Sequence, residues 1–226
     1  MARRKRRKTR KSADDKSDVV KRVPVGTLWR LPKYLAVSQA LERAGGWDYV
    51  TSADLARACE VKEVLVRKDL SCIRASGRPR LGYLITELCR NIEAAVGWNR
   101  ARKLAVVGPT VLAEALRLLL PLEKLNLEVT CVVDDDHAGE TAVGVRVLSM
   151  EEFLVLQAAE PVGVALVATS AEQAQALVDR LVEAGVKAVW NFSPTTLAVP
   201  DDVCAENADI ASGLAVLCHR LSKSGR

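Results

Sequence analysis

The residues best suited to bind a ligand form a loop directly after the short apolar stretch Leu104–Val107, and the loop reads Gly108-Pro109-Thr110-Val111-Leu112-Ala113. In dinucleotide-binding folds, Gly-x-Gly-x-x-Gly between the first strand and helix lets bare backbone approach a pyrophosphate at a helix N-terminus. Gly108 matches the first glycine, Ala113 is an accepted variant of the third, and Thr110 replaces the second. We expect the β-branched side chain of Thr110 to occupy the space where the pyrophosphate would touch the backbone. Two hypotheses stay open, a bound dinucleotide or a fold that has lost its ligand.

An acidic cluster ends the next apolar stretch, Val129–Val133. Asp134 follows the glycine loop at about the 20-residue separation, or slightly more, that is typical of a carboxylate that binds ribose hydroxyls. Its neighbours Asp135 and Asp136 would repel a 2′-phosphate. The sequence therefore predicts NAD rather than NADP as any nicotinamide cofactor.

Basic side chains mark a second candidate site, residues 51–70, whose pattern predicts two short helices joined by a turn at Glu60-Val61. In the second helix we expect an inward face of Val64, Leu65 and Leu70. The outward face would carry Lys62, Arg67 and Lys68, where a helix in the major groove meets phosphates and base edges. The alternative is an amphipathic helix pair with a solvated basic face.

A basic loop follows this helix pair and reads Ser76-Gly77-Arg78-Pro79-Arg80-Leu81-Gly82. Its glycines and proline exclude a helix and favour a β-hairpin wing, so residues 23–98 are interpreted as a winged-helix domain. Arg78 and Arg80 would reach a minor groove or phosphates.

Charge is divided unevenly along the 226 residues. Residues 1–103 hold 25 Lys and Arg against 11 Asp and Glu, whereas residues 104–226 hold 8 against 17. Only the first part is therefore expected to meet a polyanion. The run from Ala2 to Lys11 predicts that residues 1–22 form a disordered basic arm that adds non-specific DNA affinity.

The elements that position these sites predict an α/β chain of two folded domains. A helix with Leu35, Val37, Ala40 and Leu41 on its core face ends at Gly45-Gly46, and a helix at Ile85–Val96 ends the first domain. From 99 to 208, apolar strands alternate with helices, which predicts a Rossmann-type doubly wound parallel sheet. The strands are expected at Leu104–Gly108, Val129–Val133, Val162–Ala168 and Ala188–Phe192, and the helices at Val111–Leu120 and Ala171–Ala184. Residues 209–226 carry a last helix, about Ile210–Leu221.

The six cysteines include no C-x-x-C pair, so they indicate neither a metal site nor a disulfide framework. We expect most of them to be buried, with Cys72 the most exposed candidate for redox sensing. No apolar run of about 18 residues and no signal peptide is found, which predicts a cytoplasmic protein.

Several colinear motifs extend from Val23 to Leu221. They are Arg30-Leu31-Pro32 with Tyr34-Leu35, Thr51-Ser52-Ala53-Asp54-Leu55-Ala56, Val66-Arg67-Lys68-Asp69-Leu70-Ser71, Gly82-Tyr83, Leu181-Val182-Glu183-Ala184-Gly185-Val186-Lys187, Asn191-Phe192-Ser193-Pro194, Val199-Pro200 and Glu206-Asn207-Ala208-Asp209. Together they resemble the Rex family of NAD(H)-responsive bacterial transcriptional repressors.

The resemblance implies a homodimer that binds palindromic operator DNA and releases it when NADH rises relative to NAD+. It also implies that the terminal helix, within residues 209–226, is swapped between subunits. The helix with Arg67 and Lys68 and the wing from Arg78 to Arg80 would contact DNA. The dinucleotide would be surrounded by the glycine loop, including Leu112, and by Asp134, Thr169, Asn191, Phe192 and Pro194.

Departures from the family pattern concern its switch and its wing. Family members commonly carry an arginine and a tyrosine that pair alternately with the aspartate matched by Asp209, the candidate switch residue. Here Ala36 and Leu119 occupy those two positions. In the wing, Arg74 lies in a segment where relatives have aromatic and glycine residues, and it would strengthen phosphate contact or shift operator preference.

Two other functions stay open. One is a Rex-like DNA-binding regulator that has lost or changed its NAD(H) response. The other is an NAD-dependent dehydrogenase, which we disfavour because no substrate domain follows the Rossmann unit. The chain has only two histidines, His137 and His219, and both are expected at surface or interface positions rather than as a general base.

Overall fold

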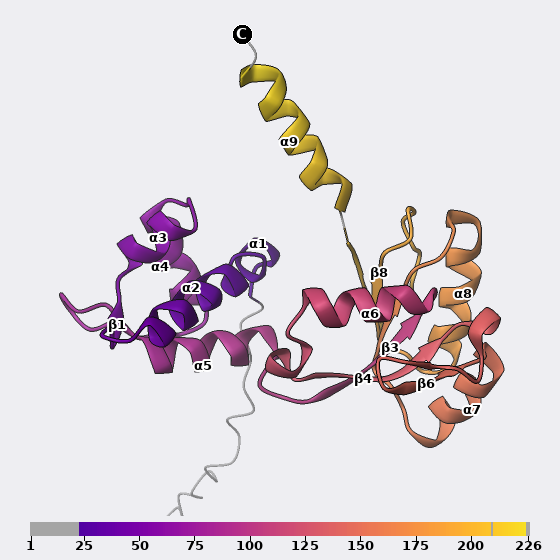
Figure 1. Cartoon of the computed structure of the whole chain (residues 1–226). Coiled ribbons are helices and arrows are strands. Elements are labelled where there is room, and N and C mark those ends of the chain that lie inside the picture. The colour runs from indigo at the N-terminus through magenta and orange to yellow at the C-terminus, as the bar shows by residue number, and fades with distance from the viewer. Residues whose placement is uncertain (1–22, 209, 225–226) are drawn as a thin grey trace, which may run out of the picture. The chain divides into compact units, whose positions relative to one another are not determined.

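The computed structural model describes residues 23–208 and 210–224, which divide into two compact units, one ending at Gly97 and one beginning at Trp98 (Figure 1). The basic arm expected at residues 1–22 and the candidate switch residue Asp209 lie outside the described residues. Each unit is described by itself.

The first unit combines helices with one short antiparallel strand pair. Its elements are α1 (Val25–Leu28), α2 (Leu31–Ala44), β1 (Tyr49–Val50), α3 (Ser52–Ala58), α4 (Glu63–Cys72), β2 (Tyr83–Leu84) and α5 (Ile85–Val96). The helix expected at 85–96 is confirmed with the same bounds. The core is built from buried apolar side chains of α2 to α5, among them Leu31, Leu55, Val66, Leu70 and Ile92.

Local chemistry explains where α3 starts and why β2 begins after a glycine. Thr51 and Asp54 form a capping box, in which the Thr51 hydroxyl accepts from the Asp54 N–H and the Asp54 carboxylate accepts from the Thr51 N–H. Gly82 has a φ of +96°, and a Cβ there would collide with the Val50 carbonyl oxygen. Only glycine therefore allows the loop to close against β1.

Two sequence-based assignments of inward faces were wrong in part, because Leu70 and Leu35 are buried as expected but one residue of each assignment is exposed. On α4 the buried residues are Val66, Asp69 and Leu70, and Val64, which was expected inside, has 74% of its surface exposed. On α2 the buried face is Leu31, Tyr34, Leu35 and Ser38, and Ala40 is exposed. In both helices the core face includes polar side chains, so spacing of apolar residues alone misplaced it.

The second unit is a seven-stranded sheet with helices on both faces. Its elements are β3 (Arg102–Val107), α6 (Thr110–Leu119), η1 (Leu122–Leu125), β4 (Leu127–Val133), η2 (Asp135–His137), β5 (Thr141–Ala142), β6 (Val145–Leu148), α7 (Met150–Ala159), β7 (Val164–Val167), α8 (Ala171–Glu183), β8 (Ala188–Asn191), β9 (Cys204–Asn207) and α9 (Ile210–Ser224). The strand order is β5-β6-β4-β3-β7-β8-β9, and every pairing except β5 with β6 is parallel. The predicted doubly wound parallel sheet is confirmed.

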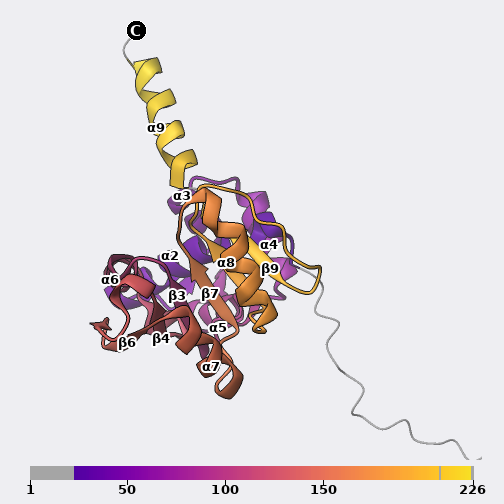
Figure 2. The ribbon, with the colours of Figure 1, turned by 90° about the vertical axis from the view of Figure 1, so that its right-hand side faces the viewer.

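Helices cover both faces of this sheet (Figure 2). α7 and α8 pack on one face, where Phe153 and Leu181 contact the cluster that includes Val107 and Val133. α6 packs on the other face, where Leu116 joins Val106 and Val132. Successive residues of β3 and β4 therefore alternate between two apolar layers, as in sheets covered on both sides.

The last helix, α9, has all its side chains from 211 to 223 exposed, including Leu214, Leu217 and Leu221. The cysteines also differ from expectation. Only Cys89 and Cys131 are buried, Cys72 is half-buried, and the exposed thiols are Cys204 and Cys218. The prediction that most cysteines are buried, with Cys72 the most exposed, was therefore wrong.

Candidate functional site

A buried carboxylate holds helix α4 in place. Asp69 accepts hydrogen bonds from Thr27 Oγ1 at 2.8 Å, from Arg30 Nε at 2.6 Å and Nη2 at 2.7 Å, and from the Tyr34 hydroxyl at 2.9 Å. Burial pushes the pKa of Asp69 upward, but the hydrogen bonds from Arg30, Thr27 and Tyr34 outweigh it and leave the pKa below its usual value. Burial and the bond to Asp69 together raise the pKa of Tyr34. The donors all come from α1, α2 and the residues between them, so this cluster fixes α4 against the start of the domain.

Sequence reasoning missed Asp69 as a positioning residue. Its side chain is only 3% exposed, and it lies on the same helix face as Val66 and Leu70. Its position on the helix was the signal that could have identified it, because a charged residue on the same helix face as two core residues needs a buried partner. The identity of that partner, Arg30, could not come from local spacing.

The outer face of α4 carries the basic residues that were expected there. Lys62 and Lys68 are exposed and enter none of the ion pairs found within the described ranges. Arg67 differs, because its Nη2 donates to Glu63 Oε1 at 2.6 Å and its Nε lies 3.3 Å from Ser52 Oγ. The Arg67 guanidinium is thus held along the helix rather than free.

The wing is a tight loop closed by two backbone hydrogen bonds between Arg78 and Gly82. Arg78 Nη1 donates to the Tyr49 hydroxyl at 2.6 Å, and its guanidinium carbon lies 5.5 Å from the centre of the Tyr49 ring. Arg74 and Arg80 are exposed and have positive φ angles of 57° and 67°. The loop therefore presents three exposed arginines, one of which is oriented by an aromatic residue of β1.

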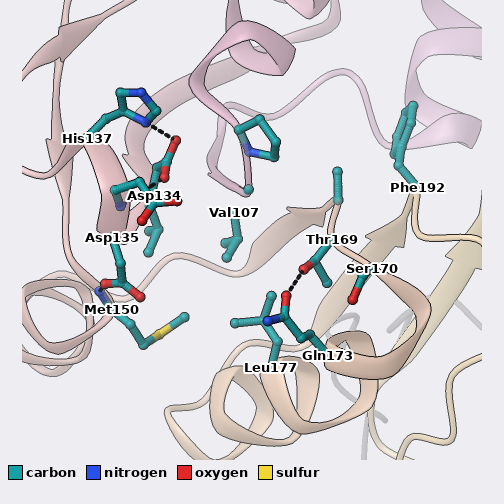
Figure 3. Close-up of a pocket in the computed structure, with 15 residues that line it drawn as sticks. Val107, Asp134, Asp135, His137, Met150, Thr169, Ser170, Gln173, Leu177 and Phe192 are labelled. Carbon is teal, nitrogen blue, oxygen red and sulfur yellow. Dashed lines mark hydrogen bonds and ion pairs between the residues drawn. The ribbon is translucent and has the colours of Figure 1, made fainter.

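In the second unit a cavity of about 890 Å³ opens at the carboxyl ends of β3, β4 and β7 (Figure 3). It is lined by Val107, Gly108, Pro109, Val133, Asp134, Asp135, Asp136, His137, Met150, Ala168, Thr169, Ser170, Gln173, Leu177 and Phe192. In open α/β sheets ligands bind at this edge, where helices leave the sheet on opposite faces. The cavity volume lies within the range of small-molecule and cofactor sites.

Asp134 is the most connected polar side chain of the cavity. Its Oδ1 accepts the N–H of Asp136 at 3.2 Å, and its Oδ2 accepts the N–H of Thr110 at 3.2 Å and lies 2.8 Å from His137 Nδ1. The hydrogen bond to Asp134 raises the pKa of His137. A carboxylate has about four acceptor positions, so one position on Oδ1 stays available for a ligand hydroxyl.

Four of the residues expected around a dinucleotide line the cavity, namely Gly108, Asp134, Thr169 and Phe192. The side chains of the other five lie elsewhere. Thr110 begins α6 and uses its N–H on Asp134, while Leu112 and Ala113 pack into the apolar layer under α6. Asn191 is buried and bonds Thr195, Asn207 and Ser193, and Pro194 is exposed next to that turn.

The geometry of the loop fits a nucleotide except at one amide. Gly108 has a φ of +135°, and a Cβ there would collide with the Ala168 carbonyl oxygen, so the loop depends on this glycine. Thr110 has no positive φ, and its side chain does not line the cavity. The steric obstacle expected from its side chain stays a prediction, and the bond from its N–H to Asp134 is a second feature that would compete with a phosphate at the start of α6.

No group of three or more His, Cys, Asp or Glu in the described part of the chain could hold a metal ion. No helix in residues 23–208 or 210–224 is long and apolar enough to cross a membrane.

Comparison with known families gives two matches that follow the two units. Residues 22–71 match the family described as "Putative DNA-binding protein N-terminus", and residues 99–195 match the family described as "CoA binding domain".

The curated relatives extend along nearly the whole chain. A protein of Porphyromonas gingivalis named "Redox-sensing transcriptional repressor Rex" is 32% identical over 92% of this chain and 96% of its own length. A protein of Thermotoga maritima named "Redox-sensing transcriptional repressor Rex 2" is 33% identical over 89% of this chain and 97% of its own length.

Solved structures agree with these relatives. A crystal structure of the protein RSP in complex with β-NAD+ and operator DNA has a TM-score of 0.81 and 27% identity, over 90% of this chain and 94% of that one. RSP in complex with β-NADH has a TM-score of 0.80 and 26% identity, over 90% and 96%.

Proposed function

The chain belongs to the Rex family of redox-sensing transcriptional repressors, and we propose that it binds palindromic operator DNA as a homodimer and releases it when NADH rises relative to NAD+. The observation that carries the proposal is the combination, in one chain, of an anchored basic helix with a cavity at the carboxyl ends of a parallel sheet. The curated relatives are repressors, and the protein is not an enzyme. The proposal places it in the cytoplasm, where operator DNA is found.

The DNA-binding residues in this proposal are Lys62, Arg67 and Lys68 of α4 together with Arg74, Arg78 and Arg80 of the wing. Lys62 and Lys68 meet phosphates or base edges directly because they are exposed and form no ion pair with a carboxylate in the described part of the chain. Arg67 reaches DNA after it leaves Glu63, or contacts DNA while still paired with it. The wing arginines contact phosphates.

The residues that hold NAD(H) in this proposal are those that line the cavity. Asp134 accepts hydrogen bonds from the adenosine ribose hydroxyls, and Gly108 lets the pyrophosphate approach the start of α6. Thr169 and Phe192 line the part of the cavity that takes the rest of the dinucleotide. Leu112 and Ala113 pack under α6, Asn191 holds its turn through hydrogen bonds, and exposed Pro194 follows that turn. The bound nicotinamide would supply the redox signal, and the protein would contribute binding and a change in dimer geometry.

A second candidate function is a DNA-binding regulator whose NAD(H) response is lost or changed. It is favoured by two observations. The Thr110 N–H is already bonded to Asp134, and the positions of the family's two switch partners hold Ala36 and Leu119, both exposed and neither able to pair with a carboxylate.

One experiment separates the two candidates. The operator is first selected from a random duplex library with the full-length protein, and its binding is then titrated with NADH and with NAD+. If NADH releases the operator at concentrations at which NAD+ has no effect, the result supports the NAD(H)-responsive repressor. A selected palindrome whose binding ignores both dinucleotides supports the second candidate, and failure to select any palindrome contradicts both. Isothermal titration of NADH against the DNA-free protein shows separately whether the cavity binds.

A further inference from the structure

One apolar side chain interrupts the charged outer face of α4. Val64 has 74% of its surface exposed, whereas the opposite face buries Val66, Asp69 and Leu70. Its side chain contributes nothing to the core of the first unit. It therefore needs an explanation outside the fold of that unit.

Helix formation does not explain Val64 either. Valine forms helices less readily than alanine, leucine, glutamate or lysine because its branched side chain loses rotamer freedom against the preceding turn. An exposed position near the start of a ten-residue helix is a place where those residues would stabilise the helix more. A valine here costs helix stability and exposes apolar surface to water.

Val64 lies on the same side of α4 as the basic side chains. It is the second residue of α4, and Lys68 follows it by four residues, so the two side chains are neighbours on one helix face. Arg67, three residues on, is held back along the helix by Glu63. In helix-turn-helix proteins the N-terminal residues of the second helix contact base edges in the major groove.

We propose that Val64 is a specificity-determining residue that contacts the 5-methyl group of a thymine in each operator half-site. The inference rests on the proposed function and adds to it the kind of base that α4 reads. The occupant is duplex DNA because cationic Lys62 and Lys68 flank the exposed valine and complement phosphates, whereas of the two acidic residues of α4 Glu63 is paired with Arg67 and Asp69 is buried. The thymine methyl is the apolar group that a base pair presents in the major groove.

The test removes the methyl group from one partner and the side chain from the other. In the operator selected with the full-length protein, each thymine is replaced in turn by deoxyuridine, which lacks only the 5-methyl group. Affinities are measured for the unmodified protein and for Val64→Ala. We expect one symmetric pair of thymines at which the unmodified protein loses about threefold to tenfold in affinity, consistent with the size of one buried methyl contact. Val64→Ala should lose a similar factor on the thymine operator and be insensitive to deoxyuridine at that pair.

A matched control uses Val25→Ala on α1, where the valine is 64% exposed but lies outside α4 and the wing. Val25→Ala should keep the whole deoxyuridine profile of the unmodified protein. Circular dichroism melting of both variants checks that neither loses its fold, which is expected because both side chains are exposed.

The outcomes distinguish this inference from the proposed function. If Val64→Ala keeps the same sensitivity as the unmodified protein at every thymine, the inference is overturned while operator binding stands. A uniform loss of affinity on all sequences, without coupling to any methyl group, also overturns it and indicates a backbone contact. If no palindrome can be selected, both the proposed function and this inference are overturned.

Discussion

Replacing Asp69 by Asn should loosen α4, the proposed DNA-reading helix, without changing any residue proposed to contact DNA. The substitution keeps the size of the side chain but removes the negative charge that accepts four hydrogen bonds from Thr27, Arg30 and Tyr34. An amide has a single acceptor oxygen, so at least one of the donors loses its partner, and the Arg30 charge is no longer balanced.

The magnitude follows from the burial of the pair. Breaking a fully buried ion pair by removing one partner costs about 3–5 kcal/mol. The Arg30 side chain is 25% exposed, so water can solvate part of its charge, and we expect a loss nearer to about 2–3 kcal/mol. At 1.4 kcal/mol per factor of ten, amide hydrogens of α4 should exchange about 30-fold to 150-fold faster.

Hydrogen exchange read by mass spectrometry measures this effect in the full chain, because peptides from α4 report on the first unit separately from the sheet. A double-mutant cycle with Arg30→Met shows whether the loss comes from the pair itself. The two substitutions together should cost about 1–2 kcal/mol less than the sum of the single ones. Unchanged exchange in Asp69→Asn, or full additivity in the cycle, would refute the reasoning.

The same pair makes a pH-dependent contribution. Because the pKa of Asp69 is lower in the folded protein than its usual value, the stabilisation is present above the unfolded pKa of about 3.9 and disappears as the pH falls through the lower folded pKa. Once corrected for the intrinsic pH dependence of amide exchange, the protection factors of α4 in the unmodified protein should therefore fall below about pH 4. The Asp69→Asn variant should lack this component.

Three further predictions concern the outer face of α4 and the cavity. Glu63→Gln should release Arg67 and strengthen operator binding by about twofold to fivefold at low salt, with a steeper salt dependence in fluorescence anisotropy titrations. Thr110→Gly should change NADH affinity by less than about threefold in isothermal titration, because the N–H stays bonded to Asp134; a gain of about tenfold or more would restore the steric explanation. Asp134→Asn should weaken NADH binding by about tenfold or more and return the pKa of His137 towards its ordinary value, which an NMR titration of that histidine would show.

The parts of the fold that the sequence predicted well are those with a strong local pattern. The strands β3, β4, β7 and β8 are short apolar runs because helices cover both of their faces, and α5 has a clear apolar stripe. The elements that were not predicted lack such patterns. β9 is an edge strand whose side chains are all exposed, and α7 carries a consecutive apolar run, Phe153 to Leu156, without a single apolar stripe.

The misplacement of Val64 has the same origin. Counting apolar residues assigns valine to the core and aspartate to the surface, and for Val64 and Asp69 of α4 both assignments are reversed. Asp69 is buried because Arg30, 39 residues earlier in the chain, supplies its counter-charge. Such long-range compensation leaves no trace in local spacing.

At the nucleotide site the motif predicts one obstacle and the structure adds a second. A missing second glycine predicts a steric block by the Thr110 side chain, and the structure in addition joins the Thr110 N–H to Asp134 across the ends of β3 and β4. A dinucleotide must then exchange existing hydrogen bonds for new ones, and an exchange of this kind yields a net gain of only about 0.5–1.5 kcal/mol per bond. We therefore expect the affinity of the cavity for NADH to depend on the competition for Asp134 more than on the residue at position 110. We also expect this affinity to shift with the protonation of His137, the third group bound to the same carboxylate.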